Sequence, residues 1–305
     1  MARRNPLAVI EAPSILGLRP TGVERLSARL IENGLVDRLG ARHAGRVEPP
    51  PYSPRRDPDT LTLNARAIAG WTPRLADAVE AVLDGGEFPI LLGGDCSILL
   101  GPALALRRRG RYGLLFIDGH ADFYQPEANP NGEAASMDLA FATGHGPHTL
   151  CNLEGRAPLV RPDDVVAFGF RDEEEQRQYG SQPLPRELLA LGLHEIRRTG
   201  VGPAASRALE RLTRSGLDGF FIHLDADSLD DEIMPAVDYR IPGGLTWEEL
   251  KEVLTAALST GRAAGMEVTI YNPALDEDGR AGQALTDVLA AAFGEREPPA
   301  RSSFL

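Results

Sequence analysis

Short apolar runs alternate with amphipathic stretches along most of the chain. The runs are mostly continuous rather than alternating in polarity, which is the pattern of strands buried on both faces of a parallel sheet. Several stretches between them carry apolar residues at helical spacing. This alternation of strand and helix predicts a doubly wound α/β sheet. Strands are expected at 7–10, 88–92, 112–117, 165–169, 219–224 and 266–271.

The clearest helix is expected after Thr246. Thr246 and Glu249 form a capping-box pattern, and the apolar residues from Leu250 to Leu258 have helical spacing. Gly261 can end this helix. The remaining expectations are helices at 73–83, 98–108, 185–191, 202–213 and 283–293, loops at 49–54 and 125–133, and a solvated acidic segment at 172–175.

Composition limits the class of protein and its partners. A chain of 305 residues that is 43% hydrophobic suits one large domain or two small ones. Its 32 Lys and Arg against 44 Asp and Glu give a formal net charge of -12, so nucleic acid and anionic membranes are poor partners. Cys96 and Cys151 make no disulfide scaffold and suit a reducing compartment. The apolar run 7–10 is too short for a signal peptide or a membrane span, so a cytoplasmic location is expected.

Acidic residues and a histidine follow two of the expected strands, as Asp118-Gly-His120-Ala-Asp122 and Asp225-Ala-Asp227. Because a strand alternates its faces with period two, the charged residues of each motif can converge. Crowded carboxylates repel each other unless cations neutralise them, and carboxylates with histidine can hold Mn²⁺, Zn²⁺ or Fe²⁺. Each motif alone could be an acidic turn, but the pair predicts a metal site.

Two other segments adjoin these motifs. Gly93–Ser97 follows an expected strand and opens a helix, which is the pattern of a tight turn with Asp95 or Ser97 as the helix cap. His223 precedes Asp225 by two residues and therefore shares its face, deeper in the sheet. We expect His223 to have a structural role or to support the metal ligands from outside.

In this order along the chain, the motifs resemble those of the ureohydrolase family, which includes arginase, agmatinase and formiminoglutamase. The similarity covers most of the chain. It implies a single domain over residues 1–305, a three-layer α/β/α fold with a mainly parallel sheet, a small-molecule substrate and a homo-oligomer. The segments that carry it are 12–35, 93–97, 118–122, 224–227, 235–246 and 272–273.

The resemblance also implies a catalytic centre. The family holds two divalent metal ions, expected to be Mn²⁺, which make hydroxide available at neutral pH and direct it at the planar carbon of a guanidinium. Asp118 and Asp225 would bridge both ions, and Asp122 would also orient the hydroxide as the catalytic residue. The implied ligands are Cys96 and Asp122 for one ion, His120 and Asp227 for the other, and Asp118 and Asp225 for both.

Three positions depart from the family pattern. Cys96 stands where the family has histidine. Its softer sulfur favours Zn²⁺ over Mn²⁺ at that position, and a second possibility is that this ion is absent and the centre holds only one. Ala135 replaces a proton-shuttling histidine, and Ile270 replaces a glutamate that pairs with the guanidinium. Glu133 and Asp138, in the loop after the first motif, are the expected replacement contacts to substrate, although loop solubility would also explain them.

We therefore expect a metal-dependent hydrolase of a C–N bond in a guanidino-, amidine- or amide-type small molecule other than plain arginine. The alternative is a catalytically degenerate member of the family that binds a ligand or serves as a partner protein. A deacylase is a third reading, by analogy of fold alone.

Overall fold

The computed structural model describes residues 5–294, and residues 1–4 and 295–305 of the expected domain lie outside the described part. The centre is an eight-stranded sheet in which all strand pairs are parallel. Its strands are β1 (Leu7–Glu11), β2 (Arg42–Arg46), β3 (Phe88–Leu92), β4 (Tyr112–Ile117), β5 (Val165–Phe168), β6 (Leu189–Leu191), β7 (Gly219–Asp225) and β8 (Ala263–Thr269). They are ordered β2-β1-β3-β8-β7-β4-β5-β6 across the sheet.

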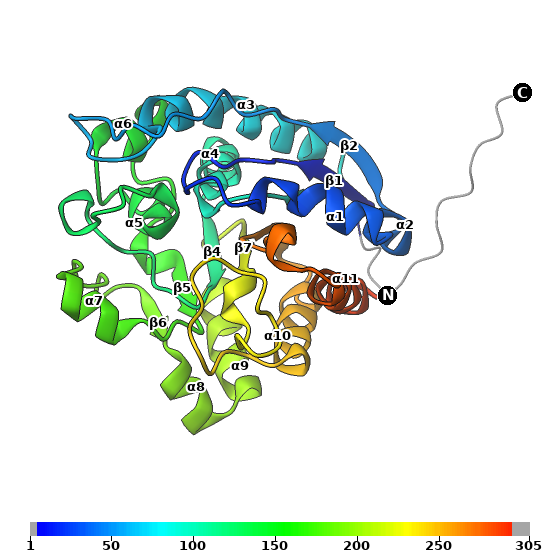
Figure 1. Ribbon diagram of the computed structural model, residues 1–305. Coiled ribbons are helices and arrows are strands. Elements are labelled where there is room, and N and C mark those ends of the chain that lie inside the picture. Colours follow the sequence, from blue (N-terminus) through cyan, green and yellow to red (C-terminus); the bar gives the residue numbers. More distant parts are fainter. Residues whose placement is uncertain (1–4, 295–305) are drawn as a thin grey trace, which may run out of the picture.

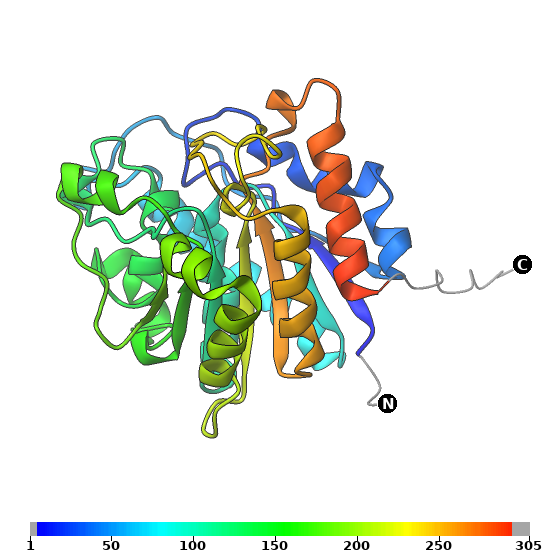
Figure 2. The same ribbon diagram turned by 90° about the horizontal axis from the view of Figure 1, so that it is seen from below.

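Helices connect the strands and cover both faces of the sheet (Figures 1 and 2). The α-helices are α1 (Leu26–Glu32), α2 (Leu35–Leu39), α3 (Ala65–Asp84), α4 (Leu100–Arg109), α5 (Asp138–Ala142), α6 (His148–Cys151), α7 (Glu173–Tyr179), α8 (Leu193–Thr199), α9 (Val201–Leu212), α10 (Trp247–Ser259) and α11 (Arg280–Phe293). Short 3₁₀ turns lie at Val23–Arg25, Cys96–Leu99, Pro126–Ala128, Ala134–Ser136, Leu153–Gly155, Pro162–Asp164, Ala226–Ser228 and Pro273–Leu275. No helix in the described range is long and apolar enough to cross a membrane.

The continuous apolar runs are explained by a core on each face of the sheet. In β1, Leu7 and Val9 join the core under α1, α10 and α11, whereas Ala8 and Ile10 join the core under α3 and α4. Successive side chains of a strand point to opposite faces, so a strand covered on both sides is apolar throughout. The predicted three-layer α/β/α fold with a parallel sheet is therefore confirmed.

One predicted helix is wrong. The segment 185–191 contains a turn, in which Leu188 N donates to Pro185 O, followed by the short strand β6. Leu189 and Leu191 pair with Val166 and Phe168 of β5. Leu188 and Leu191 are three residues apart, which also fits one face of a helix, so the local sequence allows both structures. Pairing with β5, which is remote in sequence, decides between them.

Three other segments also differ from the prediction. The helix expected at 73–83 begins at Ala65, and Pro73 lies inside it. A proline removes one backbone hydrogen bond of a helix, and the buried face that includes Trp71 and Leu75 holds this one together. Strand β2 was not predicted because it lies at the sheet edge and its residues are polar or small. Glu173–Tyr179 is solvated as expected, but forms a helix, and the preceding Asp172 is buried.

The topology determines where functional side chains can gather. Strands β3, β8, β7 and β4 are consecutive in the sheet, and all four run in the same direction. Their carboxyl ends therefore meet at one edge, which is where ligands bind in open α/β sheets. Each of these strands is followed by a segment that contributes to the site described below.

The capping box of α10 is present and gives a stability prediction. Thr246 Oγ1 accepts a hydrogen bond from Glu249 N at 3.2 Å, and Glu249 Oε2 accepts one from Thr246 N at 2.9 Å. We expect Thr246→Ala to lower the free energy of unfolding by about 1 kcal/mol, because it leaves a helix N–H without its partner. Urea unfolding measures the change.

The matched control for this prediction is Thr255→Ala, at an exposed position within the same helix. Alanine has the higher helix propensity, so this change is expected to be neutral or slightly stabilising. Equal losses in the two variants would contradict a role for the cap.

Candidate metal centre

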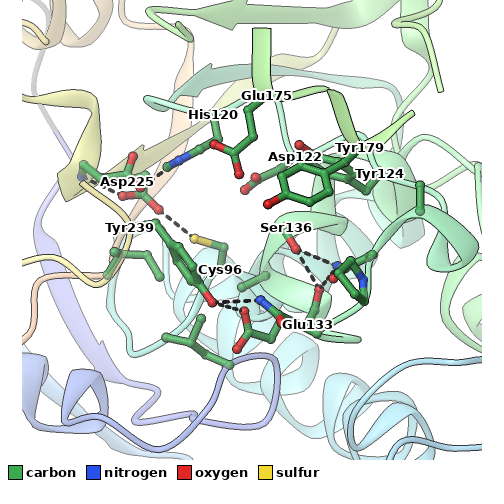
Figure 3. Close-up of a pocket in the computed structure, with 18 residues that line it drawn as sticks. Cys96, His120, Asp122, Tyr124, Glu133, Ser136, Glu175, Tyr179, Asp225 and Tyr239 are labelled. Atoms are coloured by element: carbon green, nitrogen blue, oxygen red, sulfur yellow. Dashed lines mark hydrogen bonds and ion pairs between the residues drawn. The ribbon is translucent and has the colours of Figure 1, made fainter. Parts of the chain in front are cut away.

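The predicted metal ligands lie at the shared edge of the four central strands. Asp118 directly follows β4, Asp225 ends β7, and Cys96 begins the 3₁₀ turn after β3. All three side chains are buried. Figure 3 shows Cys96, His120 and Asp225 close together in the wall of one cavity. Asp95 or Ser97 was expected to cap the segment after β3. The cap is Asp95, whose side chain accepts a hydrogen bond from Ser97 N at the start of the turn Cys96–Leu99.

Backbone N–H groups donate to the carboxylates of the two acidic loops, and one of these hydrogen bonds joins the loops to each other. Asp227 Oδ1 accepts from Gly119 N at 3.0 Å, and Asp225 Oδ1 accepts from Asp227 N at 2.7 Å. Asp118 Oδ1 accepts from His120 N at 2.7 Å. Asp225 and Asp227 thus each use Oδ1 to hold a loop, while their Oδ2 atoms lie beside Cys96 and His120.

Gly119 is required by the closeness of these loops. A Cβ at this position would lie 2.6 Å from both Asp227 O and Arg171 Nη1, which is too short for any side chain. Arg171 donates to Asp227 O at 2.9 Å and Leu229 O at 3.1 Å, while its own backbone N–H donates to Gly119 O. Arg171 therefore joins the two loops, through its guanidinium to the loop after β7 and through its backbone N–H to the loop after β4.

Two groups of potential ligands result, and in each group the ligand atoms lie within 4.8 Å of one another. The deep group consists of Cys96, Asp118, His223 and Asp225, and all of them are buried. Cys96 Sγ lies 2.8 Å from Asp225 Oδ2, and His223 Nε2 lies 3.6 Å from Asp118 Oδ2.

The outer group consists of Asp118, His120 and Asp227. His120 Nδ1 lies 2.9 Å from Asp227 Oδ2 and 3.7 Å from Asp118 Oδ1. Asp118 belongs to both groups and directs one oxygen toward each, which is the placement of a bridging ligand. Five of the six predicted metal ligands are therefore brought together, and neither group includes the sixth, Asp122.

The electrostatics of the centre fit bound cations. Burial raises the pKa of Asp225 well above its ordinary value, and the charge of Asp227 adds to this effect. Burial and the charge of Asp118 do the same to the pKa of Asp122. Burial opposes ionisation of Asp118 as well, but the imidazoles of His120 and His223 lower its pKa. Burial and mutual repulsion thus oppose ionisation of Asp122 and Asp225, and divalent ions would favour their ionised forms.

The cavity beside the outer group has a volume of about 220 Å³. Its wall contains Asp122, Ala135 and Ile270. Figure 3 shows that the Asp122 carboxylate points into the cavity. Ile270 has a backbone φ of 68°, a left-handed conformation that is unusual for a β-branched residue. Both apolar departures from the family pattern therefore face the space in which a substrate would lie.

The structure separates the two residues expected to contact substrate. Glu133 lines the cavity, where its Oε2 accepts a hydrogen bond from Tyr239 at 2.5 Å and its Oε1 lies 3.7 Å from Arg19 Nε. Burial raises the pKa of Glu133. Asp138 is fully buried at the start of α5 and is not among the cavity-lining residues.

Several residues of the site were not singled out from the sequence. Tyr124, Tyr179, Tyr239 and Glu175 line the cavity from segments without regular polarity patterns. Glu267 of β8, which its odd offset from position 270 makes a poor substitute for the missing glutamate, is buried, and its Oε1 lies 2.7 Å from His223 Nδ1. The only sequence signal for this pair was the period-two spacing between His223 and Asp225.

The chain is similar to known proteins over most of its length. The model of the Arginase family matches residues 20–294. An arginase from Bacillus caldovelox is 29% identical over 304 residues, which cover 95% of this chain and 99% of that protein. The structure of that arginase has a TM-score of 0.85 at 27% identity and covers 96% of this chain and 99% of its own. A proclavaminate amidino hydrolase from Streptomyces clavuligerus shares the fold, with a TM-score of 0.69, 18% identity, and coverage of 95% of this chain and 91% of its own.

Asp172 gives a testable pH dependence. Its Oδ1 accepts a hydrogen bond from Ala121 N in the first acidic loop, and burial raises its pKa to about 6. The folded state therefore binds this proton more tightly than the unfolded state does. The resulting stabilisation is complete below about pH 4 and is lost as the pH rises through 6.

We expect Asp172→Asn to remove this loss, because asparagine cannot ionise. Relative to the native chain, the metal-free variant should gain up to about 3 kcal/mol in free energy of unfolding between pH 4 and pH 7. Urea unfolding at several pH values measures this difference, with Asp37→Asn at an exposed position as control. Parallel pH profiles for the native chain and Asp172→Asn would show the prediction to be wrong.

Proposed function

The chain belongs to the arginase family, and on this basis we propose that it is a metal-dependent hydrolase of a C–N bond in a guanidino-, amidine- or amide-type small molecule. The family resemblance found in the sequence is confirmed. The observation that carries the proposal is the pair of ligand groups that share Asp118 in the wall of a cavity. The substrate contains a trigonal carbon, because this is the type of centre at which water can displace a nitrogen.

The cavity residues supply the positioning and proton transfer of this reaction. When bound, divalent metal ions supply a nucleophile from water at neutral pH. The Asp122 carboxylate accepts no hydrogen bond from the described residues and faces the cavity, so it can orient the attacking water and take its proton. The C–N bond then breaks, and the proton passes to the nitrogen, which leaves as an amine or ammonia.

The lining of the cavity favours a substrate with a cationic or donor-rich group. It contains no Lys or Arg among the described residues. Its acidic residues are Asp122, Glu133, Glu175, Asp225 and Asp227. Divalent ions would neutralise the acids of the metal centre, which leaves Glu133 as the buried acid outside it. Arg19 lies 3.7 Å from its Oε1, but this buried oxygen has no hydrogen-bond partner among the described residues and can accept one. We propose that Glu133 binds a donor group of the substrate.

Plain arginine is not the substrate we propose. Ile270 is apolar and fixed at the cavity wall, where it can form no charge pair with a guanidinium. Ala135 likewise has no group that could shuttle a proton. These two positions also support the alternative, in which the chain binds a ligand or a partner without turnover.

A substrate screen distinguishes the two functions. The metal-loaded chain is incubated with guanidino compounds, amidines and acyl amides, and release of urea, ammonia or amine is measured. We expect turnover with at least one class, loss of it on chelation, and a fall in kcat of at least about 100-fold in Asp122→Asn, because the general base is removed.

Asp37→Asn, far from the acidic loops in sequence and exposed, should retain full activity. Absence of turnover across the whole screen would favour the binding-only function. Turnover that survives unchanged in Asp122→Asn would contradict the role given to this carboxylate.

Glu133→Gln tests the contact with substrate. Glutamine retains an oxygen for Tyr239 but loses the negative charge, and hydrogen bonds to charged groups are stronger than neutral ones by about 1–1.5 kcal/mol. We therefore expect KM to rise about tenfold with little change in kcat. The control is Glu127→Gln, on an exposed part of the same loop. A fall in kcat with constant KM would place Glu133 in the chemical step instead.

A further inference from the structure

We propose that His223 is itself a metal ligand and that, with Cys96, Asp118 and Asp225, it forms a deep metal site that selects Zn²⁺ over Mn²⁺. The inference rests on the proposed function only in assuming that the centre binds metal. It assigns to His223 a role beyond the supporting one expected from its position in β7.

The first argument is the pair of unsatisfied atoms in the deep group. His223 Nε2 and Asp118 Oδ2 are buried, face each other at 3.6 Å, and have no hydrogen-bond partner. An unsatisfied buried polar atom costs about 1–3 kcal/mol. Two ligands of one zinc ion lie at most about 4.6 Å apart, since each bond is about 2.0–2.3 Å. The distances from His223 Nε2 to Asp118 Oδ2 and from Cys96 Sγ to Asp225 Oδ2 both fall within this limit.

The second argument is the orientation of the imidazole. His223 Nδ1 lies 2.7 Å from Glu267 Oε1, and both residues are fully buried. A neutral imidazole that donates its Nδ1 proton to this carboxylate presents the lone pair of Nε2 to Asp118. Histidine ligands of metals are typically held in this way by a carboxylate. The ring of Phe116 stacks on the imidazole, with centroids 4.4 Å apart and an interplanar angle of 7°, and so limits its rotation.

The third argument is the chemistry of the donor set. Cys96 occupies the position at which the family resemblance implies a histidine, so the imidazole is missing there. His223 returns an imidazole to the same site from β7, which lies one strand beyond β8 from β3, two residues before Asp225. The resulting set of one sulfur, one nitrogen and two carboxylates suits Zn²⁺, whereas Mn²⁺ prefers oxygen ligands. It also leaves Asp122 free to face the cavity.

The competing explanation is that a protonated His223 takes the place of the deep ion by pairing with Asp118. The distance of 3.6 Å is longer than a hydrogen bond between these groups. The two explanations differ in the number of ions, since this pairing leaves metal only at Asp118, His120 and Asp227, without sulfur.

The test measures metal content and ligand type in the full chain. The metal-free protein is loaded with Co²⁺ or Zn²⁺, the bound ions are counted by elemental analysis, and the near-ultraviolet sulfur-to-cobalt charge-transfer band is recorded. We expect two ions and a band in the native chain, loss of the band in Cys96→Ser, and loss of one ion and of the band in His223→Ala. From an equimolar mixture of Zn²⁺ and Mn²⁺, one equivalent of zinc should bind.

Two further variants and one measurement control for loss of folding and for effects unrelated to the deep site. Glu267→Gln keeps the size of the residue and should lower the zinc affinity of the deep site by about 10–100-fold, as changes in such supporting carboxylates do. His148→Ala, at an exposed position, should leave both ions and the band unchanged. If His223→Ala does not fold, X-ray absorption of the zinc-loaded native chain decides by the presence of sulfur and imidazole donors at one ion.

The outcomes separate this inference from the proposed function. One bound ion without a sulfur ligand, or two ions and an unchanged band in His223→Ala, would overturn the deep site and leave a metal-dependent hydrolase possible through the outer group. A chain that binds no metal at all would overturn both.

Discussion

The crowding of buried carboxylates at one edge of the sheet is the constraint on which the rest of the centre depends. An ionised carboxylate removed from water costs several kcal/mol unless opposite charge or hydrogen bonds compensate it. Asp118 lies between two imidazoles, and Asp225 and Asp227 accept backbone hydrogen bonds. Burial and the charge of Asp227 nevertheless raise the pKa of Asp225, and a neighbouring cation would lower it. The fold thus holds several buried carboxylates close together, and bound cations would stabilise this arrangement.

Most of the fold could be predicted because strands covered on both faces are apolar throughout and helix caps are local. The runs at β3, β4 and β7 and the capping box at Thr246 are examples. Prediction failed where a distant partner decides the structure. Segment 189–191 becomes a strand by pairing with β5, and the polar β2 becomes one by pairing with β1. Neither partner is visible in the local pattern.

The site was predictable to the extent that its residues follow strands. Asp118, His120, Asp225 and Asp227 have positions set by the sheet, so their convergence follows from strand order. The loop after Asp122 has no such periodicity. For this reason the sequence could not separate Glu133, which lines the cavity, from Asp138, which is fully buried and does not line it.

Ile270 has a consequence for how substrate preference can change during evolution. Its N–H donates to Gly94 O at 2.9 Å, which ties the end of β8 to the end of β3. The backbone here is held by main-chain contacts, in a conformation that costs an ordinary residue about 1–2 kcal/mol. The side chain makes no contribution to that tie, so a substitution at position 270 alters the chemistry of the cavity wall without redirecting the chain. A change of one codon at this position can therefore exchange an apolar wall for a charged one while the main-chain hydrogen bond between the ends of β8 and β3 stays in place.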